Sequence, residues 1–307
     1  MPRAHAANVD VKGFRAALEA SLQGEVRFDA VSRALYATDA SVYKIRPLGV
    51  VVPRSREDLV RTVQICRQFG CPITLRGGGT SQAGQAIGDG GIVDTSKYLT
   101  RILDLDLAER RVRVEPGLVL DALNAALAPH RLRFAPDIST ASRATVGGMM
   151  ANNSSGARSV LYGKTIDHVL EQHVVLSDGT VAHFRRLTPD ELESACAGAG
   201  LEAHCYREVR RISAGAADEV ALRFPRILRR VGGYNLDAFA PPASGAGPAA
   251  VSSGFDLTRL MVGSEGTLGV VLDATLSLVP LPTAKAVMAV QFTDLLGALE
   301  AAPAILA

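Results

Sequence analysis

The chain has 307 residues, of which 48% are hydrophobic, and its formal net charge is +2. This length allows a sizeable core and, at roughly 100–200 residues per domain, about two domains. The near-neutral charge, with arginines spread among carboxylates, disfavours nucleic acid as a partner. Residues 1–10 lack the apolar core of a signal peptide, and no apolar run is long enough to span a bilayer, so we expect a cytoplasmic protein.

The residues that most often bind metals are dispersed. Cys66, Cys71, Cys196 and Cys205 form no Cys-x-x-Cys pair, and the six histidines show no ligand spacing. This pattern predicts neither a disulfide framework nor an iron–sulfur or zinc site within the chain. We therefore expect buried free thiols and no metal.

The first predicted element is an amphipathic helix over residues 9–22. Phe14, Leu18 and Leu22 recur in it at four-residue spacing, which places them on one face of a helix. We expect this helix to pack on the body of the protein and to have no further role.

A β-α-β unit follows. The apolar run at 49–52 predicts a strand, Ser55 is a helix N-cap, Gly70 ends the helix, and 72–75 reads as a second, parallel strand. The next residues therefore lie at the carboxyl end of a parallel strand, which is where ligands bind such sheets.

A glycine-rich loop occupies that place. Residues 76–84 read Arg-Gly-Gly-Gly-Thr-Ser-Gln-Ala-Gly. Backbone without a Cβ approaches a ligand closely, and successive N–H groups in such a turn bind oxyanions. The loop has neither the Rossmann nor the P-loop spacing. We expect a bulky residue at Gly78 to cost most of the ligand affinity, because its side chain would intrude where backbone touches phosphate.

The sheet then becomes antiparallel. Strands at 102–105 and 111–114 form a predicted hairpin, a helix follows over 118–127, and a second hairpin begins at 174–176. Residues 188–230 read as mostly helical.

The last part of the chain contains a third glycine-bearing turn. Pro241 to Gly254 has the composition of a linker or surface insertion. Residues 263–269 form the turn and run into an apolar strand at 270–279. A new strand and helix are expected over 285–306.

The segment 135–163 is rich in glycine, small residues and polar side chains with little charge. Such a composition usually indicates a solvated loop. The alternative is a second backbone surface against a ligand, with Gly147-Gly148 permitting close approach and Asn152, Ser154 and Ser155 offering hydrogen bonds.

Several of these segments, in this order from about Tyr36 to Val279, resemble the flavin-binding domain shared by vanillyl-alcohol oxidase, p-cresol methylhydroxylase and the FAD-linked D-lactate, glycolate and D-2-hydroxyglutarate dehydrogenases. The segments that carry the resemblance are Tyr36–Ser41, Arg76–Ser81, Pro136-Asp137, Thr145–Gly148, Asn152–Gly156, Tyr162-Gly163 and Gly263–Gly269.

The resemblance implies an α+β fold. Its flavin-binding domain has two subdomains, a small parallel β-α-β part and a larger antiparallel sheet with helices. The domain would span residues 1–283, with subdomains at about 40–100 and 101–283. Residues 284–307 would begin a substrate or cap domain.

The resemblance also implies FAD as the cofactor, with the 77–81 loop wrapped around the pyrophosphate and residues 136–156 along the pyrophosphate and flavin. Some relatives bond the flavin covalently to a histidine directly after the glycines. Thr80 stands there, so we expect non-covalent FAD. The residues expected to bind it are Arg76, Gly77, Gly78, Gly79, Thr80, Ser81, Gln82, Gly84, Pro136, Asp137, Ser142, Gly147, Gly148, Asn152, Ser154, Ser155, Gly156, Gly163, Val169 and Glu265.

The implied activity is oxidation of a CH–OH donor, a D-2-hydroxy acid such as lactate, glycolate or 2-hydroxyglutarate, by hydride transfer to flavin N5. In such relatives the catalytic groups and, in some, a metal lie in the cap domain, so no catalytic residue is named here. Arg76, Arg143 and Arg158 could face a substrate carboxylate, although ion pairing is the preferred role for the last two.

Two other interpretations stay open. The chain could be a non-catalytic, flavin-binding electron-transfer subunit or fragment of a larger complex, or a globular α+β protein whose glycines are structural. Asn152–Arg158 and Gly232–Leu236 resemble large bacterial members fused to an iron–sulfur part, which would be one electron acceptor. A quinone is the other, and it would bring membrane contact, for which the sequence offers no support.

Overall fold

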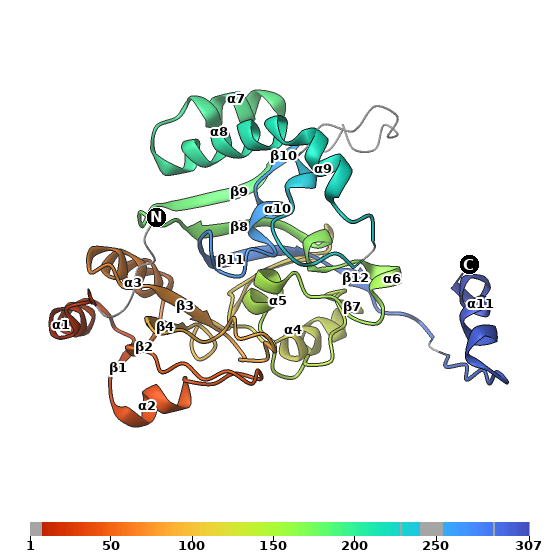
Figure 1. Ribbon diagram of the computed structural model, residues 1–307, viewed down its shortest axis with the longest axis horizontal. Coiled ribbons are helices and arrows are strands. Elements are labelled where there is room, and N and C mark those ends of the chain that lie inside the picture. Colours follow the sequence, from red (N-terminus) through yellow and green to blue (C-terminus); the bar gives the residue numbers. More distant parts are fainter. Residues whose placement is uncertain (1–7, 228, 240–253, 285, 307) are drawn as a thin grey trace.

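The two larger of three β-sheets lie beside each other in the computed structural model, which describes residues 8–227, 229–239, 254–284 and 286–306 (Figure 1). One sheet is built from residues 25–94 and the other from residues 102–277. Apart from Gly254, the insertion predicted at Pro241 to Gly254 lies outside the described residues. The α+β prediction is confirmed, while the predicted subdomain and cap boundaries stay predictions.

The first sheet has four strands in the order β1-β2-β4-β3. Its β2, β4 and β3 run parallel, and β1 pairs antiparallel with β2. Every residue of β2 and β4 is buried, as expected for parallel strands covered on both faces. The strands are β1 (Glu25–Arg27), β2 (Gly49–Val52), β3 (Ile73–Arg76) and β4 (Gly91–Asp94).

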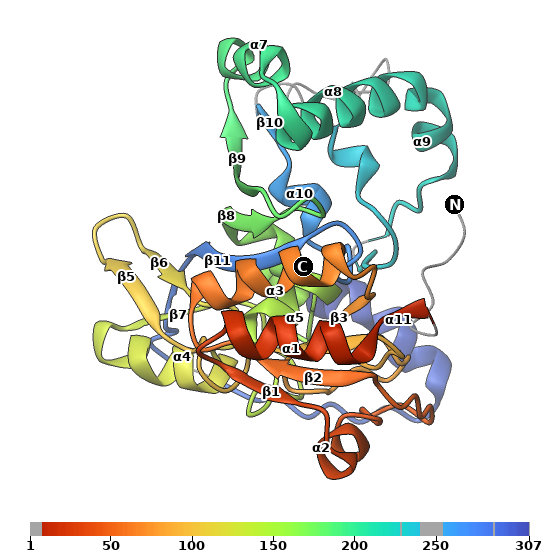
Figure 2. The same cartoon turned by 90° about the vertical axis from the view of Figure 1, so that its left-hand side faces the viewer.

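The helices of this unit confirm the local predictions. Ser55 caps α3 by accepting a hydrogen bond from the amide of Asp58, and Gly70 follows the helix with a φ of +62°. Helix α1 buries Phe14 and Leu18 and lies next to α3 (Figure 2). The helices are α1 (Val11–Ser21), α2 (Ala30–Leu35) and α3 (Arg56–Gln68).

The second sheet has six antiparallel strands in the order β10-β9-β8-β11-β6-β5. Both predicted hairpins are present, as β5-β6 and β8-β9. Buried and exposed residues alternate along β9, so one face of the sheet meets the core. The strands are β5 (Ile102–Asp106), β6 (Arg111–Val114), β8 (Val169–Val175), β9 (Val181–Leu187), β10 (Phe255–Asp256) and β11 (Val270–Ser277).

Helices pack on the buried face of this sheet. Near β9, Phe184 packs edge-on against Tyr206 of α8, at 5.9 Å between ring centroids. The helical stretch predicted at 188–230 is confirmed by α7 to α9. The remaining elements are α4 (Leu120–Leu127), β7 (Leu132–Arg133), α5 (Val146–Asn152), α6 (Ser159–Tyr162), α7 (Pro189–Ala197), α8 (Gly200–Gly215), α9 (Ala217–Arg223), α10 (Thr258–Met261) and β12 (Val279–Pro280).

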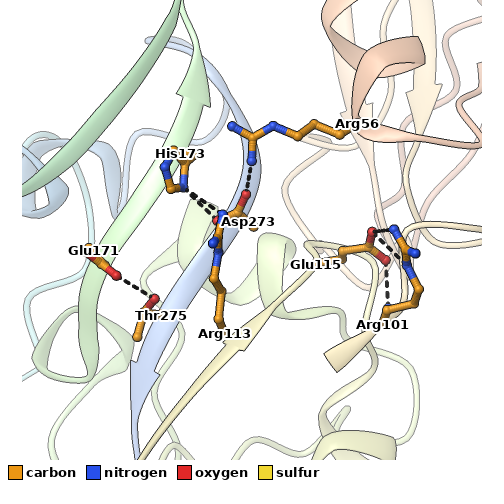
Figure 3. A network of polar contacts seen from close by, with 8 residues as sticks. All are labelled: Arg56, Arg101, Arg113, Glu115, Glu171, His173, Asp273 and Thr275. Atoms are coloured by element: carbon orange, nitrogen blue, oxygen red, sulfur yellow. Dashed lines mark hydrogen bonds and ion pairs between the residues drawn. The ribbon is translucent and has the colours of Figure 1, made fainter. Parts of the chain in front are cut away.

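A buried carboxylate joins the two units (Figure 3). Asp273 of β11 accepts hydrogen bonds of 2.8 Å from Arg113 Nε and from His173 Nδ1, and it pairs with Arg56 at the start of α3. Burial alone would raise the pKa of Asp273, but the hydrogen bonds from Arg113 and His173 outweigh burial and lower it. This network fixes α3 to the six-stranded sheet.

The C-terminal segment departs from its prediction. Helix α11 (Leu295–Leu306) forms and lies apart from both sheets in Figure 1. The prediction of a strand before this helix is wrong, because residues 286–294 form no strand. No described strand pairs with this segment, so a β conformation would leave its backbone without ladder partners. None of the helices in the described ranges is long and apolar enough to cross a membrane.

Candidate cofactor site

A cleft of about 1520 Å³ lies where the two units meet. The four-stranded unit contributes β3 and the glycine-rich loop over residues 76–83. The second unit contributes residues 144–155 and the turn over 264–271. The three glycine-bearing segments singled out in the sequence therefore line a single cavity.

The glycine-rich loop presents free backbone donors. None of the amide N–H groups of residues 78–83 donates a hydrogen bond to any described part of the protein. Gly79 has a φ of +64°, a conformation that favours glycine. Its carbonyl oxygen accepts a hydrogen bond of 3.0 Å from the amide of Ala40. Unpaired amides in a concave turn suit an anion such as a phosphate group.

Arg76 holds this loop in place. Its guanidinium donates to the carbonyl oxygens of Thr38, at 3.0 Å, and Ala86, at 3.1 Å. It also lies over the ring of Tyr36, 5.7 Å from the centroid. Since the guanidinium already binds two carbonyl groups across the loop, the geometry supports a positioning role for Arg76.

The opposite side of the cleft begins at α5. Thr145 caps this helix, and the amide of Gly147 donates to the carbonyl oxygen of Pro116 at 2.8 Å. Gly148 is exposed and lines the cleft. A Cβ at this position would meet only the hydroxyl oxygen of Thr145 within 4 Å, at 3.3 Å. Part of the segment predicted as either solvated loop or ligand-lining backbone is thus a helix beside the cleft.

The glycine-rich loop packs directly on the residues before α5. A Cβ at Gly78 would collide with the carbonyl oxygen of Arg143 and lie 2.9 Å from its carbonyl carbon, and one at Gly77 would collide with Thr145. The reason expected for glycine at 78 therefore needs correction. The residue allows two protein segments to meet, so a bulky substitution would disturb the cleft itself before it met a ligand.

The third segment is a tight turn anchored on the C-terminal end of α5. The amides of Gly263 and Glu265 donate to the carbonyl oxygens of Met150, at 2.9 Å, and Ala151, at 3.0 Å. Glu265 has a φ of +52°, which is uncommon for a residue other than glycine. Its side chain accepts a 3.0 Å hydrogen bond from Gln85 Nε2.

Two buried side-chain atoms beside the cleft lack a partner among the described residues. They are the acceptor Gln85 Oε1 and the donor Asn153 Nδ2. Asn153 is fully buried, and its Oδ1 accepts a 3.0 Å hydrogen bond from the amide of Ile166. Unsatisfied buried polar atoms cost free energy, so a ligand that offers both a donor and an acceptor fits this cleft.

Sequence reasoning proposed neither of these residues for the site. Asn153 stands in a motif that was recognised, but the neighbouring Asn152 was chosen. Asn153 is the left-handed C-cap of α5, with a φ of +48°, and its side chain is buried. Gln85 gave no local signal.

Many of the predicted cofactor residues line the cleft. Their role in binding stays a prediction, since lining a cavity is not contact with a ligand. They are Arg76, Gly77, Gly78, Gly79, Thr80, Ser81, Gln82, Gly147, Gly148, Asn152, Ser154, Ser155 and Glu265.

The other predicted residues do not line it. Val169 is buried in the core. A Cβ at Gly156 would collide with the carbonyl oxygen of Asp137, and Asp137 pairs with Arg158 at 3.1 Å. These contacts hold Asp137 against the segment 156–158. The residues outside the lining are Gly84, Pro136, Asp137, Ser142, Gly156, Gly163 and Val169.

The described residues hold no group of three or more His, Cys, Asp or Glu side chains arranged for a metal ion. What the cleft offers is free amide donors, backbone open to close approach and a few buried polar atoms. These features define a protein that binds a phosphate-bearing organic cofactor.

Comparison with known proteins identifies the cofactor. Residues 47–185 match the family model described as FAD binding domain. The chain is 39% identical to a D-2-hydroxyglutarate dehydrogenase of Pseudomonas putida, over 93% of this chain and 28% of that protein. It is 29% identical to the glycolate oxidase subunit GlcD of Bacillus subtilis, over 86% of this chain and 44% of that subunit. The match over residues 47–185 and the similarity to these relatives make FAD the cofactor of the chain.

A solved structure of alkyldihydroxyacetonephosphate synthase shares the fold. Its TM-score is 0.61 at 19% identity, and the match covers 89% of this chain and 41% of that one. The cleft suits FAD on its own geometry as well, because the free amides of residues 78–83 complement a pyrophosphate and Gly148 leaves the facing helix open.

Proposed function

We propose that the chain is the FAD-binding part of an enzyme that oxidises a CH–OH donor, a D-2-hydroxy acid such as 2-hydroxyglutarate, lactate or glycolate. The observation that carries this proposal is the 39% identity to a D-2-hydroxyglutarate dehydrogenase over 93% of the chain. The relatives named for glycolate and D-lactate support the same substrate class. The chain spans about 28% of the length of the D-2-hydroxyglutarate dehydrogenase it matches.

The bound flavin supplies a two-electron acceptor for the hydride that leaves the hydroxyl-bearing carbon. The amides of residues 78–83 would hold the pyrophosphate, and α5 and the turn over 263–267 would line the rest of the site. We assign the base that removes the hydroxyl proton to no described residue.

The cofactor is held without a covalent bond in this proposal. Thr80 stands directly after the glycines, and its hydroxyl group does not form the flavin bond that a histidine forms in some relatives. Acid precipitation of the purified chain tests this point. We expect the yellow colour to pass into the supernatant, whereas colour retained in the precipitate would refute the Thr80 argument.

Turnover is tested by adding D-2-hydroxyglutarate, D-lactate or glycolate to the FAD-loaded chain without oxygen. Bleaching of the flavin band by a D isomer, and none by the L isomer, is the expected result. FAD binding without bleaching by any of these acids would favour the second candidate, a flavin-binding electron-transfer fragment of a larger complex. The electron acceptor stays open between an iron–sulfur domain and a quinone, and a cytoplasmic location stays a prediction.

A further inference from the structure

Gln85 and Glu265 come from opposite sides of the FAD cleft. Gln85 lies between the glycine-rich loop and β4, in the four-stranded unit, and Glu265 lies between α10 and β11, in the second unit. Both residues line the cleft. The 3.0 Å hydrogen bond from Gln85 Nε2 to Glu265 Oε1 therefore bridges the cleft between residues 180 positions apart.

The backbone at each end of this bridge is fixed. The amide of Glu265 is bonded to the carbonyl oxygen of Ala151. Next to Gln85, the carbonyl oxygen of Ala86 accepts a hydrogen bond from Arg76. Because neither end is free to follow the other, separation of the two units at this point must break the contact.

The Gln85 amide has a second, unpaired end. Its Oε1 is buried and has no donor among the described residues, and the residue lines the cleft. FAD carries ribityl hydroxyls, and a hydroxyl that reached this atom would satisfy it. One amide would then bind the opposite side through Nε2 and the cofactor through Oε1.

We propose that Gln85 and Glu265 form a clasp across the FAD cleft that slows release of the cofactor. This proposal rests on the cleft as the FAD site and requires no turnover, so failure of the proposed activity would leave it intact. Loss of one hydrogen bond of this kind predicts an increase of about 3- to 10-fold in the rate of FAD dissociation.

An exchange of the two side chains tests the clasp in the full chain. Gln85→Glu places two carboxylates against each other, and we expect FAD to dissociate about 10-fold faster or more. The double variant Gln85→Glu/Glu265→Gln reverses donor and acceptor, and its rate should return to within about twofold of the original. Gln68→Glu, which adds the same charge on the exposed surface of α3, is the matched control and should leave the rate unchanged.

The rate is followed by the rise in flavin fluorescence after dilution. Repulsion between the carboxylate introduced by Gln85→Glu and the cofactor phosphates is the competing explanation, and it predicts no rescue in the double variant. A double variant as fast as Gln85→Glu, or a Gln85→Glu variant as slow as the original, would overturn the proposal.

The apoprotein provides an independent readout, because the contact joins two side chains of the protein itself. Gln85→Glu should lower its Tm by about 1–3 °C, and the exchange should restore it. Tm changes that simply add across the variants would show that these side chains do not interact, and would also overturn the clasp.

Discussion

Gly148 provides the most direct test of the cofactor site, because it lines the cleft and an added side chain would meet little of the protein itself. A Cβ there meets only the Thr145 hydroxyl, at 3.3 Å, and the residue lies in the first turn of α5. We predict that Gly148→Ala leaves the apoprotein folded and weakens FAD binding. The added methyl group would occupy space that the cofactor needs against the helix.

The magnitude follows from two opposed effects. Alanine in place of glycine within a helix stabilises the folded chain by about 0.5–1 kcal/mol, offset in part by the close contact with Thr145. In the complex, a methyl group inserted into a filled site costs about 1–3 kcal/mol. This cost corresponds to a rise of about 5- to 160-fold in the Kd for FAD. The variant should therefore be no less stable without FAD and distinctly weaker with it.

Titration of the apoprotein with FAD, followed by flavin fluorescence, measures the Kd, and thermal unfolding without FAD measures stability. Gly215→Ala, at the exposed end of α8 with nothing within 4 Å of its Cβ, is the matched control. Gly78→Ala should instead destabilise the apoprotein, because its Cβ collides with the backbone of Arg143. Unchanged FAD affinity in Gly148→Ala, with the same fold, would refute the placement of the cofactor against α5.

Two further predictions concern the network that joins the sheets in Figure 3. Asp273→Asn should lower the free energy of unfolding by about 1–3 kcal/mol in a urea titration, because the amide presents a donor where Arg113 and His173 need an acceptor; an unchanged midpoint would contradict this role. Burial lowers the pKa of His173, and the contact with Asp273 opposes this only in part. The neutral imidazole therefore stabilises the folded state fully above about pH 6.5, the ordinary pKa of histidine, and this contribution is lost as the pH falls. His173→Gln should reduce the loss of Tm between pH 7 and 5, and an identical slope would contradict the assignment.

Local sequence signals were sufficient for the first β-α-β unit. The apolar run of β2, the cap at Ser55 and the stop at Gly70 are short-range patterns, and each appears in the structure as predicted. The order of the first sheet was not readable in this way. Strand β4 lies between β2 and β3 although it follows both in the chain, because strand order depends on packing between distant residues.

The cleft was predictable in its parts and not in its assembly. Glycine repeats indicate where a side chain is excluded. They do not show whether a ligand or a neighbouring segment of the protein occupies that space. Gly78 and Gly148 look alike in the sequence, yet one packs on Arg143 and the other is open to the cleft. That difference depends on a contact across 65 residues, which no local pattern encodes.

The same reasoning explains why no local sequence pattern indicated Gln85 and why this residue is informative about the cleft. A cofactor site consists of polar groups that the protein leaves unsatisfied, such as the amides of residues 78–83 and the atoms Gln85 Oε1 and Asn153 Nδ2. Folding alone penalises the two buried side-chain atoms, since each loses water without gaining a partner. FAD would supply phosphate oxygens for the free amides, and its hydroxyls offer both donors and acceptors to groups of this kind. Binding of FAD should then stabilise both sides of the cleft together, with the contact between Gln85 and Glu265 closing it.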